Sequence, residues 1–106
     1  MRMGAIVVTY SVDGSNVEEL YRRVQDHIVP SARQTNGYRG FLLIDLRDGQ
    51  HQAILLFDSV EDVGAAQQSL GPVGREHTYA LMSGPATGTI GTVVVSDGVL
   101  EGSPTP

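Results

Sequence analysis

The chain has 106 residues, a formal net charge of −5 and a pI near 4.9. This length fits a single domain, and the acidic balance argues against nucleic acid as a partner, because nucleic-acid-binding domains carry a basic surface. The chain contains no cysteine, which excludes disulfides, thiolate metal sites and a cysteine nucleophile.

Signals for membrane insertion or export are weak. The longest apolar run covers residues 53–57, whereas a membrane-spanning helix needs about 20 apolar residues. The N-terminal stretch MRMGAIVVTYSVDG has neither a long apolar region nor a small-residue cleavage site. We therefore expect a cytoplasmic protein that does not enter a membrane.

The first part of the chain predicts a strand followed by a helix. Residues 4–12 are rich in β-branched side chains, which favours a strand. Ser15 and Glu18 have the spacing of a capping box, which predicts the start of a helix. Pro30 lacks the N–H that a continuous helix would use, so we expect a kink or break there, and Gly37 suits the end of the helix. One apolar stripe at helical spacing consists of Val17, Leu20, Tyr21, Val24 and Ile28.

A hairpin follows this helix. Residues 39–47 and 51–58 predict two strands, and the dipeptide Asp48-Gly49 between them predicts a tight turn. If this dipeptide is the whole loop, one face of the hairpin is apolar almost from end to end, and we expect that face to carry the helices. Its pairs are Leu46 with His51, Ile44 with Ala53, Leu42 with Leu55, and Gly40 with Phe57. The pairs on the other face are Arg47 with Gln50, Asp45 with Gln52, Leu43 with Ile54, Phe41 with Leu56, and Arg39 with Asp58.

The last part of the chain predicts a second helix and a fourth strand. Ser59 is placed to cap a helix over residues 60–70, and Gly71-Pro72 is expected to end it. Residues 73–87 have no clear period and predict a surface loop with one helical turn. Strand character returns over residues 88–96.

The resulting order is β-α-β-β-α-β, which is typical of an α+β, ferredoxin-like fold with an antiparallel four-stranded sheet and both helices on one face. We expect one domain over residues 1–96 and a flexible C-terminal tail over residues 97–106.

Two helices cover only one face of such a sheet. The second face of the hairpin is too apolar to remain in water, so we expect a homodimer in which two sheets pack against each other. The predicted interface residues are Phe41, Leu43, Asp45, Ile54 and Leu56.

Two stretches of the sequence carry a family resemblance. The end of the first helix reads PSARQTNGYRGFLLID, and the passage into the second helix reads LLFDSVEDVGAA. Together they resemble the dimeric α/β-barrel superfamily, in particular proteins of the antibiotic biosynthesis monooxygenase type. In that family a Pro-Gly-aromatic-x-Gly/Ser signature ends the first helix, and Trp-Glu-Ser precedes the second. Here Asn36 stands where proline is usual, and Phe57-Asp58-Ser59 replaces Trp-Glu-Ser. The resemblance covers residues 4–96, and its motifs specify the fold better than the chemistry.

The resemblance implies a dimeric α/β barrel with a ligand pocket between sheet and helices. Some members are cofactor-free monooxygenases that act on flat, largely apolar organic molecules with dioxygen, without a bound metal or flavin. Haem-degrading members use an asparagine in the first strand, a tryptophan in the second helix and a histidine after it. Only the histidine has a counterpart here, His77, so haem degradation is the less favoured activity.

Several residues are candidates for the chemistry. His77 lies between Glu76 and Tyr79 and could act as a general base, or it could be a partly exposed loop histidine. Asp45 could form an interface pair with Gln52 and an arginine, or it could be an active-site acid. The predicted substrate-binding residues are Tyr21, Tyr79, Phe57 and His51, although Tyr21 also fits the core and His51 also fits the rim of the sheet.

The three histidines do not have metal-ligand spacing, so no metal site is expected. Two hypotheses remain open. The chain is either a small dimeric cofactor-free monooxygenase or a non-catalytic, ligand-binding or stress-associated dimer.

Overall fold

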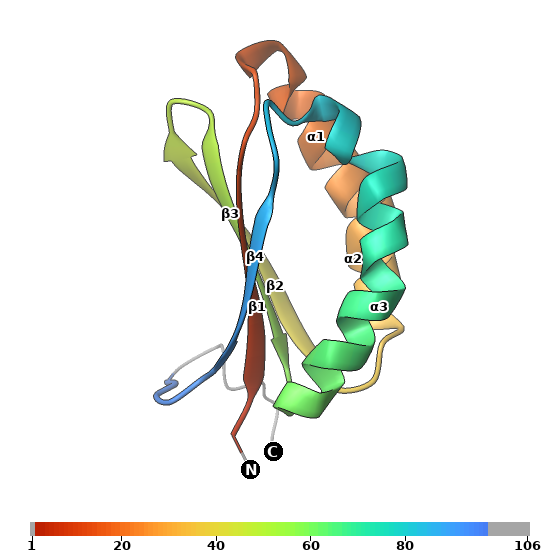
Figure 1. Ribbon diagram of the computed structural model, residues 1–106, viewed down its shortest axis with the longest axis vertical. Coiled ribbons are helices and arrows are strands. Elements are labelled where there is room, and N and C mark those ends of the chain that lie inside the picture. Colours follow the sequence, from red (N-terminus) through yellow and green to blue (C-terminus); the bar gives the residue numbers. More distant parts are fainter. Residues whose placement is uncertain (1, 98–106) are drawn as a thin grey trace.

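The computed structural model describes residues 2–97, which form one layer of sheet and one layer of helices (Figure 1). The sheet order is β2-β3-β1-β4, and all neighbouring strands are antiparallel. The helices cover one face, which confirms the predicted α+β, ferredoxin-like arrangement. The strands are β1 (Gly4–Ser11), β2 (Tyr38–Arg47), β3 (Gln50–Phe57) and β4 (Thr87–Thr92). The helical elements are η1 (Gly14–Asn16), α1 (Val17–Arg23), η2 (Val24–Ile28), α2 (Val29–Arg33), α3 (Val60–His77) and η3 (Tyr79–Leu81).

The hydrophobic core lies between the two layers. Every second residue of β1 and β3 faces the helices, as the period of two in a strand requires. These strand residues meet the apolar stripe of the first helix and two residues of α3. The buried core residues include Ile6, Tyr10, Leu20, Val24, Ala53, Leu55, Phe57, Val63 and Ala66.

The first helix contains a π-turn in place of the predicted kink at Pro30. The elements α1, η2 and α2 follow one another without a break, and the N–H of Val29 bonds to the carbonyl of Val24, five residues back. The wider turn lies just before the proline, so the helix passes the residue that lacks a donor. The predicted capping box is wrong, because residues 14–16 form a 3₁₀ turn and no side chain caps α1.

The second helix begins as predicted and ends later. Ser59 Oγ accepts the N–H of Asp62 at 3.2 Å. The predicted end at Gly71-Pro72 is wrong, because α3 continues to His77. Contacts with the rest of the fold support the added turns: Arg23 donates a hydrogen bond to the His77 carbonyl at 3.0 Å. Tertiary contacts here override the low helix propensity of glycine and proline. The last strand is shorter than the predicted 88–96.

The β2–β3 hairpin has a different register from the predicted one. The turn at Asp48-Gly49 is present, but a β-bulge between Asp45 and Arg47 leaves Leu46 without a partner in the ladder. Because the side-chain period is two, this one extra residue exchanges the two faces of β2 over residues 40–45, and a second register shift lies between Tyr38 and Gly40. Leu43 therefore pairs with Ala53 and not with Ile54.

The bulge revises the set of residues available to a partner chain. Ile54 and Leu56 lie on the outer face of the sheet as expected, whereas Phe41, Leu43 and Asp45 lie on the helix side. The β2 side chains that do point outward include Leu42 and Ile44, which are 40% and 36% exposed, and Leu46 in the bulge is 47% exposed. The interface itself stays a prediction.

Within residues 2–97 no helix is both long and apolar enough to cross a bilayer. The predicted flexible tail, except Asp97, lies outside the described residues, and the domain limits stay a prediction.

Candidate functional site

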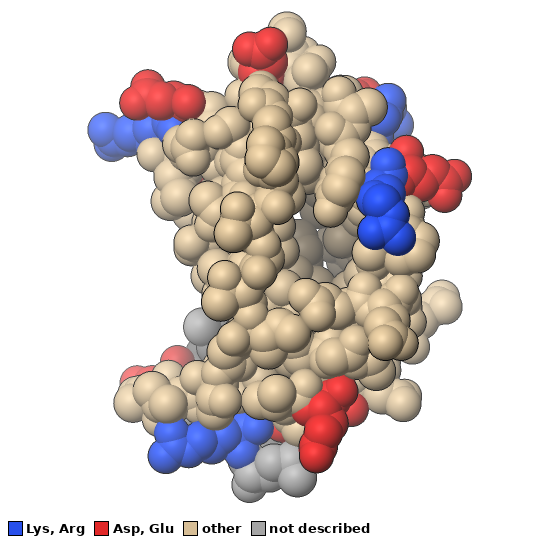
Figure 2. Space-filling model, in the orientation of Figure 1, with Lys and Arg blue, Asp and Glu red and all other residues tan. Residues whose placement is uncertain are grey.

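A cavity of about 500 Å³ lies between the sheet and the helices η2 and α3. The space-filling view shows the molecule hollowed at this place (Figure 2). Its wall is mainly apolar, with side chains from β1, β2 and β3 on one side and from η2 and α3 on the other. Among the lining residues are Ile6, Val8, Val24, Ile28, Phe41, Leu55, Leu70 and Met82. A cavity of this size and polarity fits a small organic ligand.

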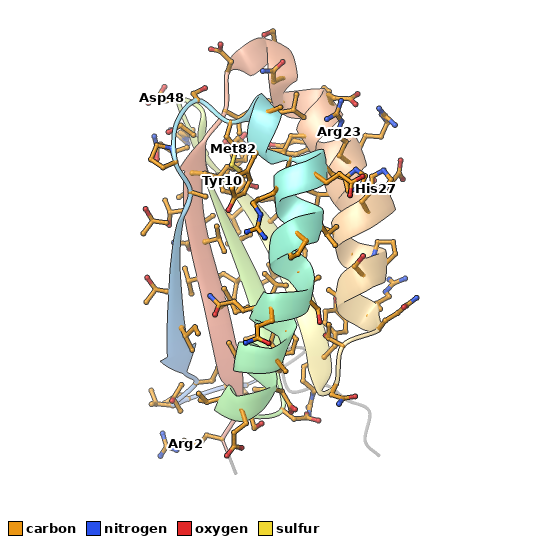
Figure 3. The ribbon with its side chains drawn as sticks, turned by 45° about the vertical axis from the view of Figure 1, so that its right-hand side comes forward. Arg2, Tyr10, Arg23, His27, Asp48 and Met82 are labelled. Carbon is orange, nitrogen blue, oxygen red and sulfur yellow. The ribbon has the colours of Figure 1, made fainter. Side chains whose placement is uncertain are left out.

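Tyr10 places a hydroxyl group inside this cavity. Only 6% of the residue is exposed, and it lines the cavity together with Met82 (Figure 3). The hydroxyl forms no hydrogen bond with any residue of the described chain. Burial, followed by the effect of Tyr21, raises the pKa of Tyr10 to about 12. The group is therefore a protonated donor at neutral pH, and a buried donor without a partner is rare in folded proteins.

His51 supports the ring of Tyr10. The two rings stack with centroids 5.9 Å apart and planes within 10°. His51 is 1% exposed; its Nδ1 lies 3.0 Å from the Gly49 carbonyl, and its Nε2 lies 2.7 Å from the Tyr21 hydroxyl. Because a carbonyl only accepts, Nδ1 carries the proton, and in the neutral ring Nε2 accepts from Tyr21. The predicted position of His51 at the rim is wrong, since this histidine is buried.

Tyr21 belongs both to this cluster and to a second, smaller cavity of about 320 Å³. Burial raises the pKa of Tyr21, and the negative charges of Asp45 and Glu18 add to the effect. The hydroxyl is therefore protonated at neutral pH. Phe41 and Val24 line both cavities and separate them.

Arg75 brings the one positively charged side chain among the residues that line the larger cavity. A Cβ built on Gly71 would lie 3.5 Å from Arg75 Nη1, so the guanidinium folds back over the preceding turn of α3. Gly71 also lines the cavity. Among residues 2–97 no carboxylate forms an ion pair with Arg75.

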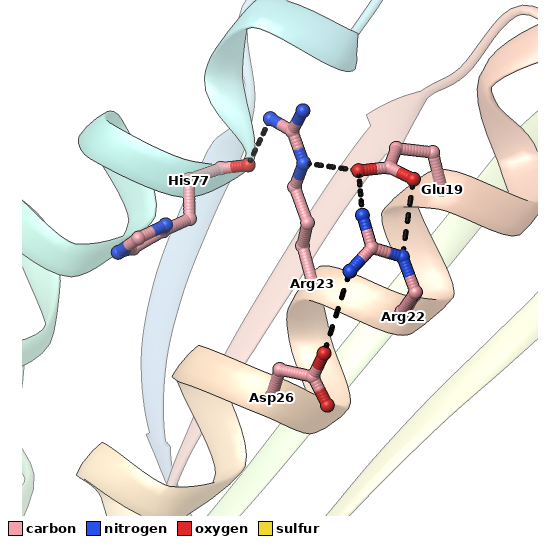
Figure 4. Close-up of polar contacts among 5 residues, drawn as sticks. All are labelled: Glu19, Arg22, Arg23, Asp26 and His77. Atoms are coloured by element: carbon pink, nitrogen blue, oxygen red, sulfur yellow. Dashed lines mark hydrogen bonds and ion pairs between the residues drawn. The ribbon is translucent and has the colours of Figure 1, made fainter.

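The structure places His77 outside the cluster formed by Tyr10, His51 and Tyr21. Its ring stacks on that of His27 with centroids 3.7 Å apart, and its Nε2 lies 3.8 Å from a Glu76 oxygen. His77 does not line the larger cavity. Figure 4 shows its carbonyl bound to Arg23, which also binds Glu19. In this structure its contacts join the helices to each other.

The other predicted site residues do not share one site. Tyr79 lines the larger cavity and is 49% exposed, whereas Phe57 is fully buried in the core and does not line it. Asp45 accepts the Arg47 N–H at 2.8 Å and so stabilises the bulge. Its predicted pair with Gln52 is wrong, because Gln52 stands opposite Ile44.

Sequence reasoning missed Arg75 as a site residue. The tyrosines Tyr10, Tyr21, Tyr38 and Tyr79 are candidates for a pocket between sheet and helices from the sequence, and of these Tyr10 and Tyr79 line the larger cavity. Arg75 lies in a segment that predicted a loop. Among the described residues no group of three or more His, Asp or Glu side chains could hold a metal ion.

Comparisons with known proteins support the fold. No protein-family model and no curated protein matches this sequence. A protein of unknown function from Nitrosomonas europaea superposes with a TM-score of 0.77 at 12% identity, covering 92% of this chain and 94% of that one. A second protein from the same organism, named as a "putative antibiotic biosynthesis monooxygenase", gives 0.75 at 18% identity, covering 92% and 95%. SnoaB, a cofactor-independent oxygenase from Streptomyces nogalater, gives 0.68 at 17% identity, covering 91% and 97%.

The chain is therefore similar in fold to antibiotic biosynthesis monooxygenase-like proteins, over nearly its whole length. This confirms the resemblance seen in the sequence at the level of the fold.

Proposed function

We propose that the chain forms a cytoplasmic homodimer that binds a flat, largely apolar organic molecule in the 500 Å³ cavity and oxidises it with dioxygen. The observation that carries the proposal is the buried Tyr10 hydroxyl, a donor without a partner among the described residues, in a cavity whose wall is mainly apolar. The fold shared with a cofactor-independent oxygenase adds support.

The proposed reaction uses a substrate with an acidic methylene group next to a phenol or carbonyl. Transfer of one proton to solvent water leaves a carbanion, whose charge spreads onto the oxygen of the substrate. The carbanion transfers an electron to dioxygen, and the two radicals combine with the return of a proton to form a hydroperoxide. Loss of water then gives the ketone, so that R₂CH₂ and O₂ become R₂C=O and H₂O.

Tyr10 has a defined part in this scheme. Its hydroxyl donates a hydrogen bond to the substrate oxygen on which negative charge develops, which stabilises the anion more than the neutral substrate. His51 and Tyr21 act as positioning residues. Tyr10 stacks on the His51 ring, and the hydrogen bond from Tyr21 holds that ring in place. We propose His77 as the base only for a conformation in which its ring no longer stacks on the His27 ring.

The test is oxygen uptake with dithranol, an anthrone that carries such a methylene group. The parent protein is expected to consume one O₂ per ketone formed, with one atom of ¹⁸O₂ in the product. Tyr10→Phe should slow the reaction on the order of 100-fold, as removal of one stabilising donor does elsewhere. Tyr38→Phe is the matched control, because Tyr38 packs on Phe57 and lines neither cavity. Equal rates in Tyr10→Phe and the parent would contradict the role of Tyr10.

A non-catalytic ligand-binding protein is the second candidate. The residues that line the larger cavity include no histidine, aspartate or glutamate, so no ordinary general base touches it within the described chain. Binding of dithranol without oxygen uptake above the buffer rate would favour this function.

A further inference from the structure

The charge of Arg75 is unusual for its surroundings. The chain has twelve acidic residues and only seven arginines. Arg22 and Arg23 bind Glu19, and Arg39 binds Asp58. Arg75 has no such partner among residues 2–97, although it lines a cavity whose wall is mainly apolar.

Arg75 is an exposed residue of α3 that also lines the cavity, so its charge lies where the cavity meets solvent. Its guanidinium lies over Gly71, where the absence of a side chain leaves room beside the cavity. A charge next to an apolar wall is less well screened than one in open water, so its attraction for an anion is stronger. The planar guanidinium also matches the two oxygens of a carboxylate.

Tyr10 supplies a second donor to the same cavity. Neither group has an acceptor in the described protein, but only Tyr10 is buried, whereas Arg75 is exposed. An unpaired buried donor costs free energy that a matching ligand oxygen would recover.

We propose that the natural ligand is an aromatic carboxylate whose carboxylate group pairs with Arg75 and whose second oxygen, a hydroxyl or carbonyl, accepts a hydrogen bond from Tyr10. The apolar wall between them takes the ring system. This inference rests on the proposed use of the cavity, and it narrows the substrate to a class.

The test compares 6-hydroxy-2-naphthoate with its neutral amide, by NMR titration of the full chain. The parent protein is expected to bind the acid about 10-fold more tightly than the amide, as one charge-assisted hydrogen bond would give. Arg75→Gln should abolish this preference, while Arg75→Lys should keep part of it. Arg33→Gln is the control, because it removes the same charge from an exposed arginine that lines neither cavity.

The second donor is tested with 2-naphthoate, which lacks the hydroxyl. The parent should bind the hydroxylated acid more tightly, and Tyr10→Phe should remove that difference but retain the preference for acid over amide. Tyr38→Phe should change neither. Separate losses in the Tyr10 and Arg75 variants would distinguish the two hydrogen-bond donors from a general disruption of the cavity, which would weaken the binding of every compound.

Three results would overturn the inference: equal binding of acid and amide by the parent, an equal loss in Arg33→Gln and Arg75→Gln, or no binding of either compound. These measurements need no oxygen chemistry. A preference for the acid without dithranol oxidation would count against the oxidation of anthrones and leave this inference standing. Dithranol oxidation without a preference for the acid would support the oxygenase and refute this inference.

Discussion

His51 is oriented by two hydrogen bonds of opposite kind. Its Nδ1 donates to a backbone carbonyl and its Nε2 accepts from Tyr21, so the ring can neither flip nor rotate without losing one of them. Tyr10 stacks on this fixed ring and is held in place in turn. The direction of the Tyr10 hydroxyl therefore depends on two residues that need not touch a ligand.

Glu19 is the most strongly perturbed carboxylate among the described residues. Hydrogen bonds from Arg22 and then from Arg23 lower the pKa of Glu19 from 4.5 to about 2 (Figure 4). A carboxyl group with a lowered pKa in the folded state stabilises the fold above its unfolded pKa, and this contribution is lost as the pH falls toward the folded pKa.

Glu19→Gln should therefore lower the urea midpoint at pH 7, and the difference from the parent should shrink between pH 4.5 and pH 2. The effect is expected to be small, because the pair is exposed to solvent. Glu18→Gln is a matched control, since Glu18 lies in the same first turn of α1 and forms no ion pair within the described residues. A constant difference across this pH range would contradict the assignment.

Residue patterns in the sequence located some site residues and missed others for a physical reason. The inward parity of Tyr10 follows from strand alternation alone. The partners of His51 do not, because Tyr21 is 30 positions away and the contact depends on how the helix packs on the sheet. The sequence neighbours of His77 make it a candidate base, whereas its ring stacks on His27, which comes from another helix.

At the scale of elements, the hairpin shows the limit of pattern reasoning. Asp48-Gly49 correctly predicts a turn, but it does not reveal the bulge at Leu46. Leu42, Leu43 and Ile44 are all apolar, so either face of β2 could have faced the core and the pattern could not decide. Asp45 contributes to the choice by accepting the Arg47 N–H beside the bulge.

The second helix contains glycine where none is needed for space. A Cβ built on Gly64 would meet nothing within 4 Å. Gly64→Ala should therefore stabilise the protein by about 0.5–1 kcal/mol, because alanine has the higher helix propensity and leaves the unfolded chain less freedom. The free energy of unfolding, from urea titration, checks this.

Gly37→Ala is the control, because it is expected to change the stability in the opposite direction. Gly37 has φ +77°, and a Cβ there would collide with the Asp62 carboxylate. This variant should be clearly destabilised. A destabilised Gly64→Ala would show that α3 needs flexibility at that position.

At the scale of the whole molecule, the helices cover one face of the sheet and leave the other open. Leu42 and Ile44 are both more than a third exposed on that outer face. A contiguous apolar face of this kind is typical of a surface that meets another protein. Because the same face recurs in both copies, a two-fold dimer is the simplest closed arrangement.

Sedimentation at micromolar concentration should give twice the chain mass of 11.3 kDa. Ile44→Lys should shift the protein to the single-chain mass, because it places a charge in the middle of the apolar face. Val60→Lys is the control, since Val60 is 44% exposed but lies at the start of α3. A parent protein that sediments as a single chain would refute the dimer.

The π-turn of η2 affects how related sequences should be compared. A π-turn holds one residue more than the α-turn that would replace it. A gene that lacks one codon within residues 24–28 would therefore encode an ordinary α-helix whose two ends still face the same neighbours. In an alignment such relatives would differ from this chain by a single gap just before Pro30, and the position of that gap would mark an insertion without any change of fold.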